Sequence, residues 1–199
     1  MMVGALLGIA GAIYGLLGAL HAVYTLGDIR SPRRIVPDDP AVKKLSEASF
    51  DVAEYIVDIA KKEGLAPGLK RLDGPVTLHM ACHARAQNMG QKAAEMLRLL
   101  PEAQVTVVER CSGHGGSWGV MKGNFETALK VGRPVARQAL GKPDAYLASE
   151  CPLAGMHIRQ GMEVLAQGEP LPDRALHPIE LVARAYGLAG DGAPATRTA

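Results

Sequence analysis

Aromatic residues and cysteines are scarce in this 199-residue chain. Aromatic residues make up only 4% of it, whereas 48% of the residues are hydrophobic, so the core has to be built from aliphatic side chains. The three cysteines are an odd number and form no CxxC pair, which argues against a disulfide framework and favours reduced thiols in a cytosolic compartment. A formal net charge of +2 is too small to indicate a nucleic-acid-binding protein.

Charged side chains are also missing from residues 2–26. An apolar helix of about 20 residues spans the hydrocarbon core of a bilayer, and no basic residues precede the segment as they would in a signal peptide. We therefore expect residues 1–27 to be a transmembrane anchor helix in the cytoplasmic membrane. The cations that follow, beginning with Arg30, would place the soluble domain on the cytoplasmic side. The alternatives are a glycine-rich core helix and a stretch without native structure.

Glycines recur at three- and four-residue steps within residues 2–26. Small residues at this spacing let two membrane helices approach closely, so the glycine face would allow a homo-oligomer to form. The proline-containing residues 28–40 are expected to be a linker and residues 189–199 a disordered tail. Between them, residues 41–188 are expected to form one domain, which begins with helices started by Asp39-Pro40 and by Asp51.

Three segments of this domain share one pattern. Each has a short β-forming run, then a cysteine in a turn, then a helical pattern; the cysteines are Cys82, Cys111 and Cys151. Strands that alternate with helices predict an α/β fold, a small parallel sheet with helices on both faces. Right-handed crossovers bring the strand ends to one edge, where open α/β sheets bind ligands. We therefore expect the three cysteines to converge there and bind a metal centre.

The turns around these cysteines contain further candidate ligands. Cations and helix amino termini lower the pKa of a thiol and favour the thiolate, which is the species that binds metal. The backbone amides of a glycine-rich turn can stabilise an anion such as a thiolate. The candidates beside the cysteines are His83, Ser112, Gly113, His114 and Gly115. The alternative for each cysteine is an inert thiol in the core.

Neighbouring residues in the same segments are interpreted as structural. His79 does not share a strand face with Cys82 and is expected to be a structural residue. Glu150 is expected to be exposed, and Pro152 suits the first position of a helix. His177 is expected to cap or pack against a final helix that begins at Pro178.

Three thiolates and one imidazole would make four ligands, the usual number for zinc or for an iron–sulfur cluster. Twenty-eight residues separate Cys82 from Cys111, and 39 separate Cys111 from Cys151. This spacing excludes a zinc finger and fits one ligand from each strand–helix unit.

At these residues the chain resembles the cysteine-rich CCG domain found in heterodisulfide reductase and in the iron–sulfur subunit of anaerobic glycerol-3-phosphate dehydrogenase. The family pattern is Cys-His, then Cys-Cys-Gly-x-x-Gly, then Cys-x-x-Cys, then a His-Pro-Ile-Glu helix. The matching stretches are Cys82-His83, residues 111–116, residues 151–154 and residues 177–180. Ser112 and Ala154 stand where the family has its other two cysteines.

The resemblance implies an iron–sulfur cluster, with zinc as the alternative, bound through Cys82, Cys111 and Cys151. It further implies an electron-transfer subunit or domain of an oxidoreductase, rather than a complete enzyme, that works with flavin or ferredoxin-type redox subunits. With three cysteines, His83, His114 or Ser112 would complete a smaller cluster. The other functions that remain open are a structural zinc domain or a metal-free domain, either of which would serve the assembly of a membrane complex.

Overall fold

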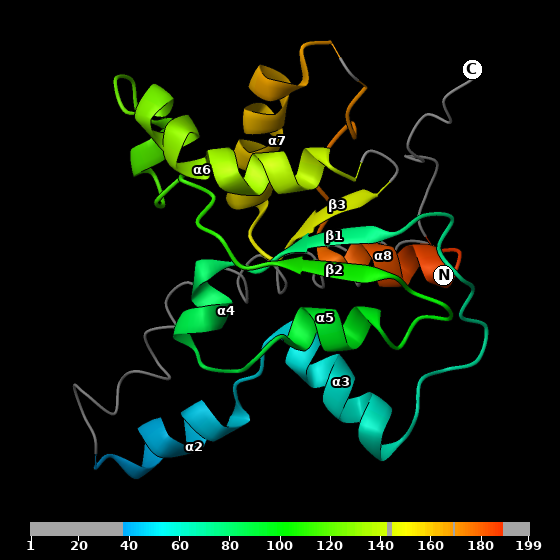
Figure 1. Cartoon of the computed structure of the whole chain (residues 1–199). Helices are drawn as coiled ribbons and strands as arrows, with labels where there is room; N and C mark the ends of the chain where they lie inside the picture. The colour runs from blue at the N-terminus through cyan, green and yellow to red at the C-terminus, as the bar shows by residue number, and fades with distance from the viewer. Residues whose placement is uncertain (1–37, 143–144, 169, 189–199) are drawn as a thin grey trace, which may run out of the picture. The chain divides into compact units, whose positions relative to one another are not determined.

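The computed structural model describes residues 38–142, 145–168 and 170–188 (Figure 1). The chain divides into two compact units, Met1–Asp51 and Val52–Ala199. The described part of the first unit is dominated by helix α2 (Pro40–Ala48), and the Asp39 side chain caps it by accepting hydrogen bonds from the amides of Ala41 and Val42. The predicted start of this helix is therefore confirmed.

The expected anchor at residues 1–27, most of the linker and the tail at residues 189–199 lie outside the described residues. Within the described part of the chain, no helix is both long enough and apolar enough to cross a bilayer. The membrane anchor and its glycine face therefore stay predictions.

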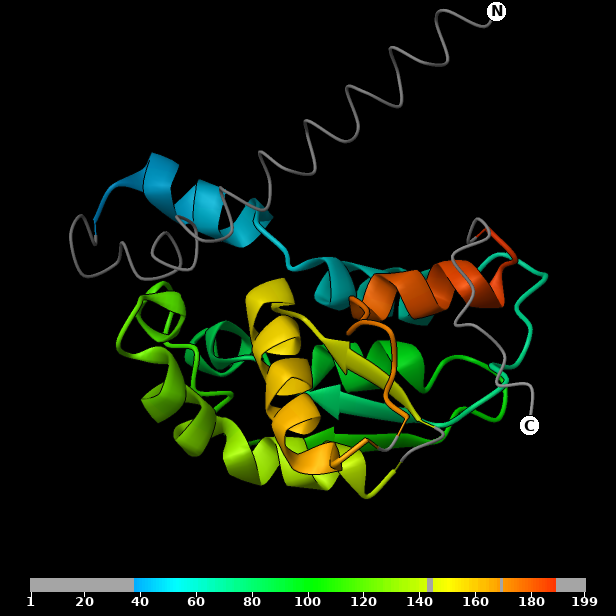
Figure 2. The ribbon, with the colours of Figure 1, turned by 90° about the horizontal axis from the view of Figure 1, so that it is seen from above.

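A three-stranded parallel sheet forms the centre of the second unit. Its strands are β1 (Val76–His79), β2 (Val105–Val108) and β3 (Tyr146–Ser149), in the order β2-β1-β3, and all three arrows point the same way in Figure 2. Beyond β3, Leu176 forms a parallel bridge to Ala148, so a short return segment lies along this edge. The parallel α/β fold predicted from the alternating pattern is confirmed.

Helices follow each strand, as the pattern predicts. After β1 come α4 (Cys82–Ala86) and α5 (Lys92–Leu97); after β2 come the short 3-10 helix η2 (Trp118–Val120) and α6 (Phe125–Leu140); after β3 come α7 (Pro152–Ala166) and α8 (Pro178–Ala185). Helix α3 (Val52–Lys62) precedes the sheet. Pro152 is the first residue of α7, as expected, because its missing N–H would have no helical partner there.

The sheet buries a different aliphatic core on each face. Val76 and Leu78 of β1 pack with α3, α5 and α8, whereas Leu147 of β3 and Val108 of β2 pack with α6 and α7. Figure 1 shows α6 and α7 above the sheet and α3 and α5 below it. Helices thus cover both faces, and the carboxyl ends of the strands are left to form the candidate site.

Helix α8 begins with the His-Pro-Ile-Glu motif, which forms a capping box. His177 Nδ1 accepts a hydrogen bond from the Ile179 amide, and the Glu180 carboxylate accepts one from the His177 amide at 2.7 Å. The expected capping role of His177 is confirmed. Arg174 donates two hydrogen bonds to the same carboxylate.

The hydrogen bond from Arg174 is the main reason why the pKa of Glu180 lies below its ordinary value of 4.5. A lowered pKa stabilises the fold above the unfolded pKa, and this stabilisation is lost as the pH falls through the folded pKa. Glu180 is partly exposed, so we expect Glu180→Gln to lower the free energy of unfolding by about 1 kcal/mol or less at pH 7. Urea unfolding at pH 7 and at pH 3 checks this, and a difference between variant and wild type that is as large at pH 3 would contradict it.

Candidate metal centre

The ends of the three strands lie side by side. His79, the last residue of β1, is paired in register with Val108 at the end of β2 and with Ser149 at the end of β3. Cys82 and Cys111 each follow their strand end by three residues, and Cys151 follows its own by two. The three cysteine turns therefore leave the sheet at the same edge, as the topology predicts. In this strand order the chain reverses direction across the sheet between β1 and β3, the place where such sheets bind ligands.

His79 ties the three turns together through hydrogen bonds. Its Nε2 lies 3.0 Å from the Arg110 carbonyl oxygen, so this nitrogen carries the proton and donates. Its Nδ1 then accepts from the Ser149 hydroxyl at 3.0 Å, and the Ser149 oxygen accepts from the Cys151 amide at 3.3 Å. Burial lowers the pKa of His79, which keeps the ring neutral. The structural role expected for His79 agrees with these bonds.

Replacing His79 with phenylalanine keeps the ring but removes both hydrogen bonds. Each buried partner left without a hydrogen bond costs about 1–3 kcal/mol, so we expect the free energy of unfolding to fall by about 2 kcal/mol or more. Thr77 is a matched control on the same face of β1, because its buried hydroxyl has no hydrogen-bond partner. Thr77→Val should leave stability unchanged or raise it. Equal unfolding midpoints in urea for His79→Phe and wild type would contradict the prediction.

The turn after Cys111 is held against α6 by contacts between backbones. Gly113 has a φ of +88°, and a Cβ there would lie 2.1 Å from the Ala128 carbonyl oxygen. A Cβ on Gly132 of α6 would lie 2.3 Å from the Ser112 carbonyl oxygen. The two glycines therefore allow the turn and the helix to touch. Gly132 was not predicted as part of the site, and a glycine inside an otherwise regular helical pattern was its only signal in the sequence.

This contact places one predicted amide on a cysteine sulfur. The Gly113 N–H donates to Cys111 Sγ at 3.4 Å, an interaction that favours the thiolate form. Gly115 and Gly116 also have positive φ values, +51° and +64°, so the turn has the backbone that its glycines predict.

His114 lies between Ser112 and Cys151. Its Nε2 is 3.8 Å from Cys151 Sγ, and its Nδ1 is 2.8 Å from the Ser112 hydroxyl oxygen. His114 is 8% exposed and Cys151 is 4% exposed, so the pair is buried. The β2 turn and the β3 turn thus meet at a thiol and an imidazole.

Cys82 lies on the rim of the same edge. It is the exposed first residue of α4, and the preceding Ala81 packs against Cys151 and Ala154. The Ala81 amide donates to the Glu150 carboxylate at 3.4 Å. Glu150 is only 7% exposed, so its expected exposure is wrong: the turn after β3 folds this side chain inward to the start of α4.

The predicted ligands are thus gathered unequally. Cys151 and His114 are in contact and buried, Cys82 and Cys111 are exposed free thiols, and His83 is half-buried on α4. Among the residues that the structure describes, no three histidine, cysteine, aspartate or glutamate side chains are grouped closely enough to hold one metal ion. A single zinc ion needs four ligands within about 2.0–2.3 Å, whereas a cluster distributes its cysteines over several iron atoms. The donor types and their spread therefore suit a cluster better than zinc.

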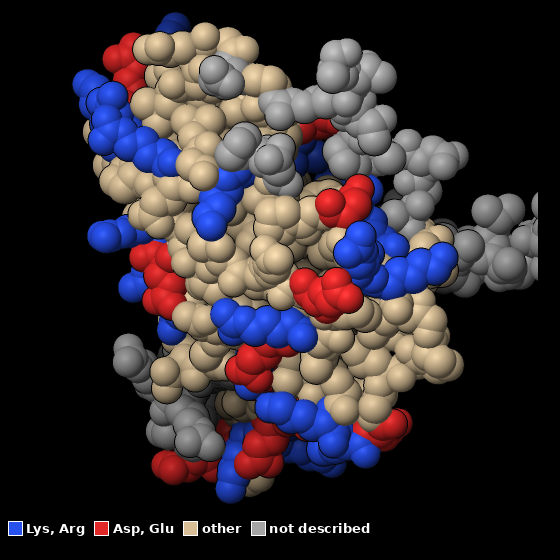
Figure 3. Space-filling model, turned by 45° about the vertical axis from the view of Figure 1, so that its right-hand side comes forward, with Lys and Arg blue, Asp and Glu red and all other residues tan. Residues whose placement is uncertain are grey.

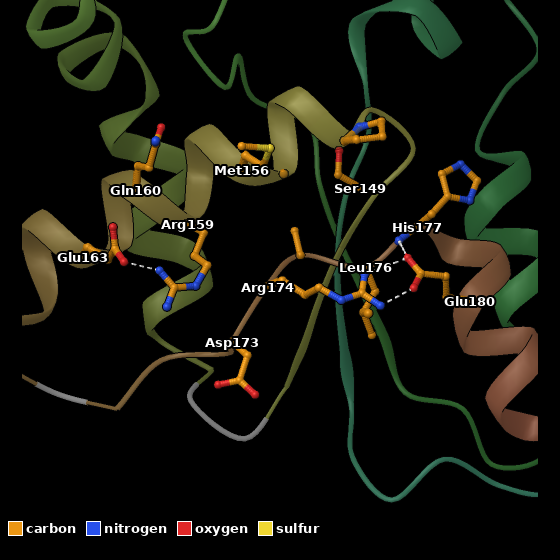
Figure 4. A pocket seen from close by; sticks show the side chains of 13 residues that line it. Ser149, Met156, Arg159, Gln160, Glu163, Asp173, Arg174, Leu176, His177 and Glu180 are labelled. Carbon is orange, nitrogen blue, oxygen red and sulfur yellow. Dashed lines mark hydrogen bonds and ion pairs between the residues drawn. The ribbon is translucent and has the colours of Figure 1, made fainter. Parts of the chain in front are cut away.

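A cleft of about 530 Å³ adjoins the site on the outer side of β3 and was not predicted from the sequence. Ser149 and Pro152 form its wall next to Cys151. In Figure 4, Arg159 reaches toward Glu163 and Arg174 toward Glu180, so the charges of its walls are largely paired. Figure 3 shows the same intermingling of acidic and basic side chains over the lower part of one face.

Comparisons with known proteins reveal several relatives, although no family model matches the chain. One relative belongs to the anaerobic glycerol-3-phosphate dehydrogenase of Escherichia coli, of which it is one of the subunits. The two chains are 28% identical over 124 residues, which are 62% of this chain and 29% of that protein. The chain is also 31% identical over 120 residues to an uncharacterized iron–sulfur protein of Methanococcus maripaludis, covering 58% of this chain and 24% of that protein.

A third relative is one of the subunits of dihydromethanophenazine:CoB–CoM heterodisulfide reductase from Methanosarcina acetivorans. It is 30% identical over 144 residues, which are 69% of this chain and 34% of that protein. The chain thus spans between a quarter and about a third of the length of these relatives. It is related to the cysteine-rich proteins of the heterodisulfide reductase and anaerobic glycerol-3-phosphate dehydrogenase type, which confirms the family predicted from its motifs.

Proposed function

We propose that this chain is an iron–sulfur redox domain that binds a cluster through Cys82, Cys111 and Cys151 and transfers electrons within an oxidoreductase complex. The observation that carries the proposal is the register of the sheet, which makes all three cysteine turns leave from adjacent strand ends. The names of the relatives, an iron–sulfur protein and redox-enzyme subunits, agree with it.

The residues present fit such a group chemically. Thiolates are the usual ligands of iron–sulfur clusters, and the Gly113 amide already points at one of the sulfurs. Hydrogen bonds to ligand sulfurs and burial both tune the reduction potential of a cluster. When bound, the cluster would supply one-electron chemistry, while Gly113 and the buried walls around Cys151 would set the polarity around it.

The partners follow from the same relatives. Two of them are subunits by name, and this chain matches only part of each. We propose that it exchanges electrons with other redox subunits, and that residues 2–26 attach it to a membrane.

Anaerobic purification of the full chain tests the proposal. We expect a brown protein with visible absorption from iron–sulfur charge transfer, containing iron and sulfide. A colourless protein with one zinc per chain would contradict the cluster and favour a structural zinc domain. A protein with neither metal would contradict both.

Ala154 offers a gain-of-ligand prediction. It lies one helical turn after Cys151 and packs, 1% exposed, against Cys151 and Ala81. Ala154→Cys would add a thiol at the site, so we expect the cluster to survive an iron chelator several times longer, followed by visible absorption. Ala166→Cys, at the buried far end of the same helix, is the matched control. Equal lifetimes in the two variants would refute the placement of Ala154 at the centre.

A further inference from the structure

We infer that His114 is the fourth protein ligand of the centre and that Ser112 is the residue that positions it. This inference rests on the proposed cluster-binding function. It selects one of the three candidates, His83, His114 and Ser112, that the sequence leaves open.

The contact with Cys151 points to His114. Its Nε2 faces the only buried cysteine sulfur of the chain at 3.8 Å, and both side chains are more than nine-tenths buried. Two groups that bind neighbouring positions of one centre have to lie in this relation. His83 is instead on α4, half-buried and adjacent in sequence to the exposed Cys82.

Ser112 determines which nitrogen of His114 is free to bind. An imidazole that ligates through Nε2 must carry its proton on Nδ1. The Ser112 hydroxyl oxygen lies 2.8 Å from Nδ1 and is buried, so it accepts that proton's hydrogen bond. Metal-binding histidines are oriented by such a partner on their other nitrogen. Ser112 stands at a cysteine position of the family pattern, and here it supports the ligand instead of being one.

The backbone around His114 holds the imidazole in place. The Gly119 amide donates to the His114 carbonyl oxygen at 2.6 Å, and a Cβ on Gly119 would lie 2.6 Å from that oxygen. On the other side, Gly113 is packed against the backbone of α6. The side chain therefore projects from a turn that is fixed at both ends, which favours a ligand over a mobile surface histidine.

A neutral imidazole in place of a thiolate changes the charge of the centre. Replacing cysteine with histidine removes one negative charge and raises the reduction potential of an iron–sulfur centre, as Rieske-type centres show. We therefore expect His114→Cys to keep the cluster and to lower its reduction potential.

Pulsed electron paramagnetic resonance of the reduced full chain tests the inference. With histidine labelled with ¹⁵N, we expect a strong nitrogen coupling from a directly bound ring that is lost in His114→Cys and His114→Ala and kept in His83→Ala. Ser112→Ala should retain iron but alter the nitrogen coupling and the potential, and Ser112→Thr, which keeps the hydroxyl, should restore both.

Each other result counts against a specific part of the proposal. A coupling that persists in His114→Cys, or that disappears in His83→Ala, would overturn His114 as the ligand. Unchanged coupling and potential in Ser112→Ala would overturn its positioning role. A cluster without any nitrogen coupling would overturn this inference alone, whereas wild-type protein without iron–sulfur absorption would overturn the proposed function as well.

Discussion

Replacing Gly113 with alanine is expected to detach the Cys111 turn from helix α6 and to destabilise the protein by about 3 kcal/mol or more. Two costs add at this position. The φ of +88° is a left-handed conformation that an alanine adopts only with strain, and the new Cβ would lie 2.1 Å from the Ala128 carbonyl oxygen. Neither backbone can move without disturbing the other, so the clash has to be relieved by opening the turn.

Gly116→Ala is the matched control for Gly113→Ala. Gly116 also has a positive φ, +64°, but no atom lies within 4 Å of the Cβ that it would gain. Its cost should be the backbone strain alone, about 1–2 kcal/mol. Urea unfolding followed by circular dichroism measures both variants. Equal losses of stability would show that the packing between the turn and α6 contributes nothing.

Replacing Cys151 with serine is expected to reduce the iron bound by the anaerobically purified chain to less than about a tenth of the wild-type content. Cys151 is the buried thiol in contact with His114, and it begins helix α7 as its N-cap residue. Serine has nearly the same size, but a hydroxyl is a poor ligand for a centre that prefers soft thiolates. The centre should therefore be lost while the fold remains.

Two measurements separate loss of the centre from loss of the fold. Iron and sulfide content and visible absorption report on the centre. Urea unfolding of the metal-free proteins reports on the fold and should differ by less than about 1 kcal/mol between Cys151→Ser and wild type. A variant that folds and retains full iron content would exclude Cys151 as a ligand and leave the proposed function without its buried thiol.

Local patterns in the sequence were sufficient to predict most of the fold. The β-forming runs beginning at Val76 and Val105 and the apolar periodicity from Phe125 to Leu140 each report on residues that are neighbours in the chain, so their strands and helix appear where predicted. Alternation of strands and helices was enough for the parallel sheet because crossovers constrain the topology. The motif residues predicted the family, since a ligand type at a given spacing is visible in one dimension.

Side-chain partners far apart in the sequence were not predictable in the same way. Nothing near Glu150 shows that it would be buried against the Ala81 amide, 69 residues away. The same holds for His79, whose partners lie 31 and 70 residues away. The partner of a buried polar group depends on which strand lies beside it and in which register.

The sequence alone therefore determined the order of the elements, the cysteines at the strand ends and the kinship with cysteine-rich redox proteins, because these depend on local composition and spacing. Only the tertiary structure decided that His114 rather than His83 contacts the buried thiol, and that Gly132 admits the Cys111 turn. Both depend on distances between segments, which are set by how α6 packs on the sheet and by the strand order β2-β1-β3.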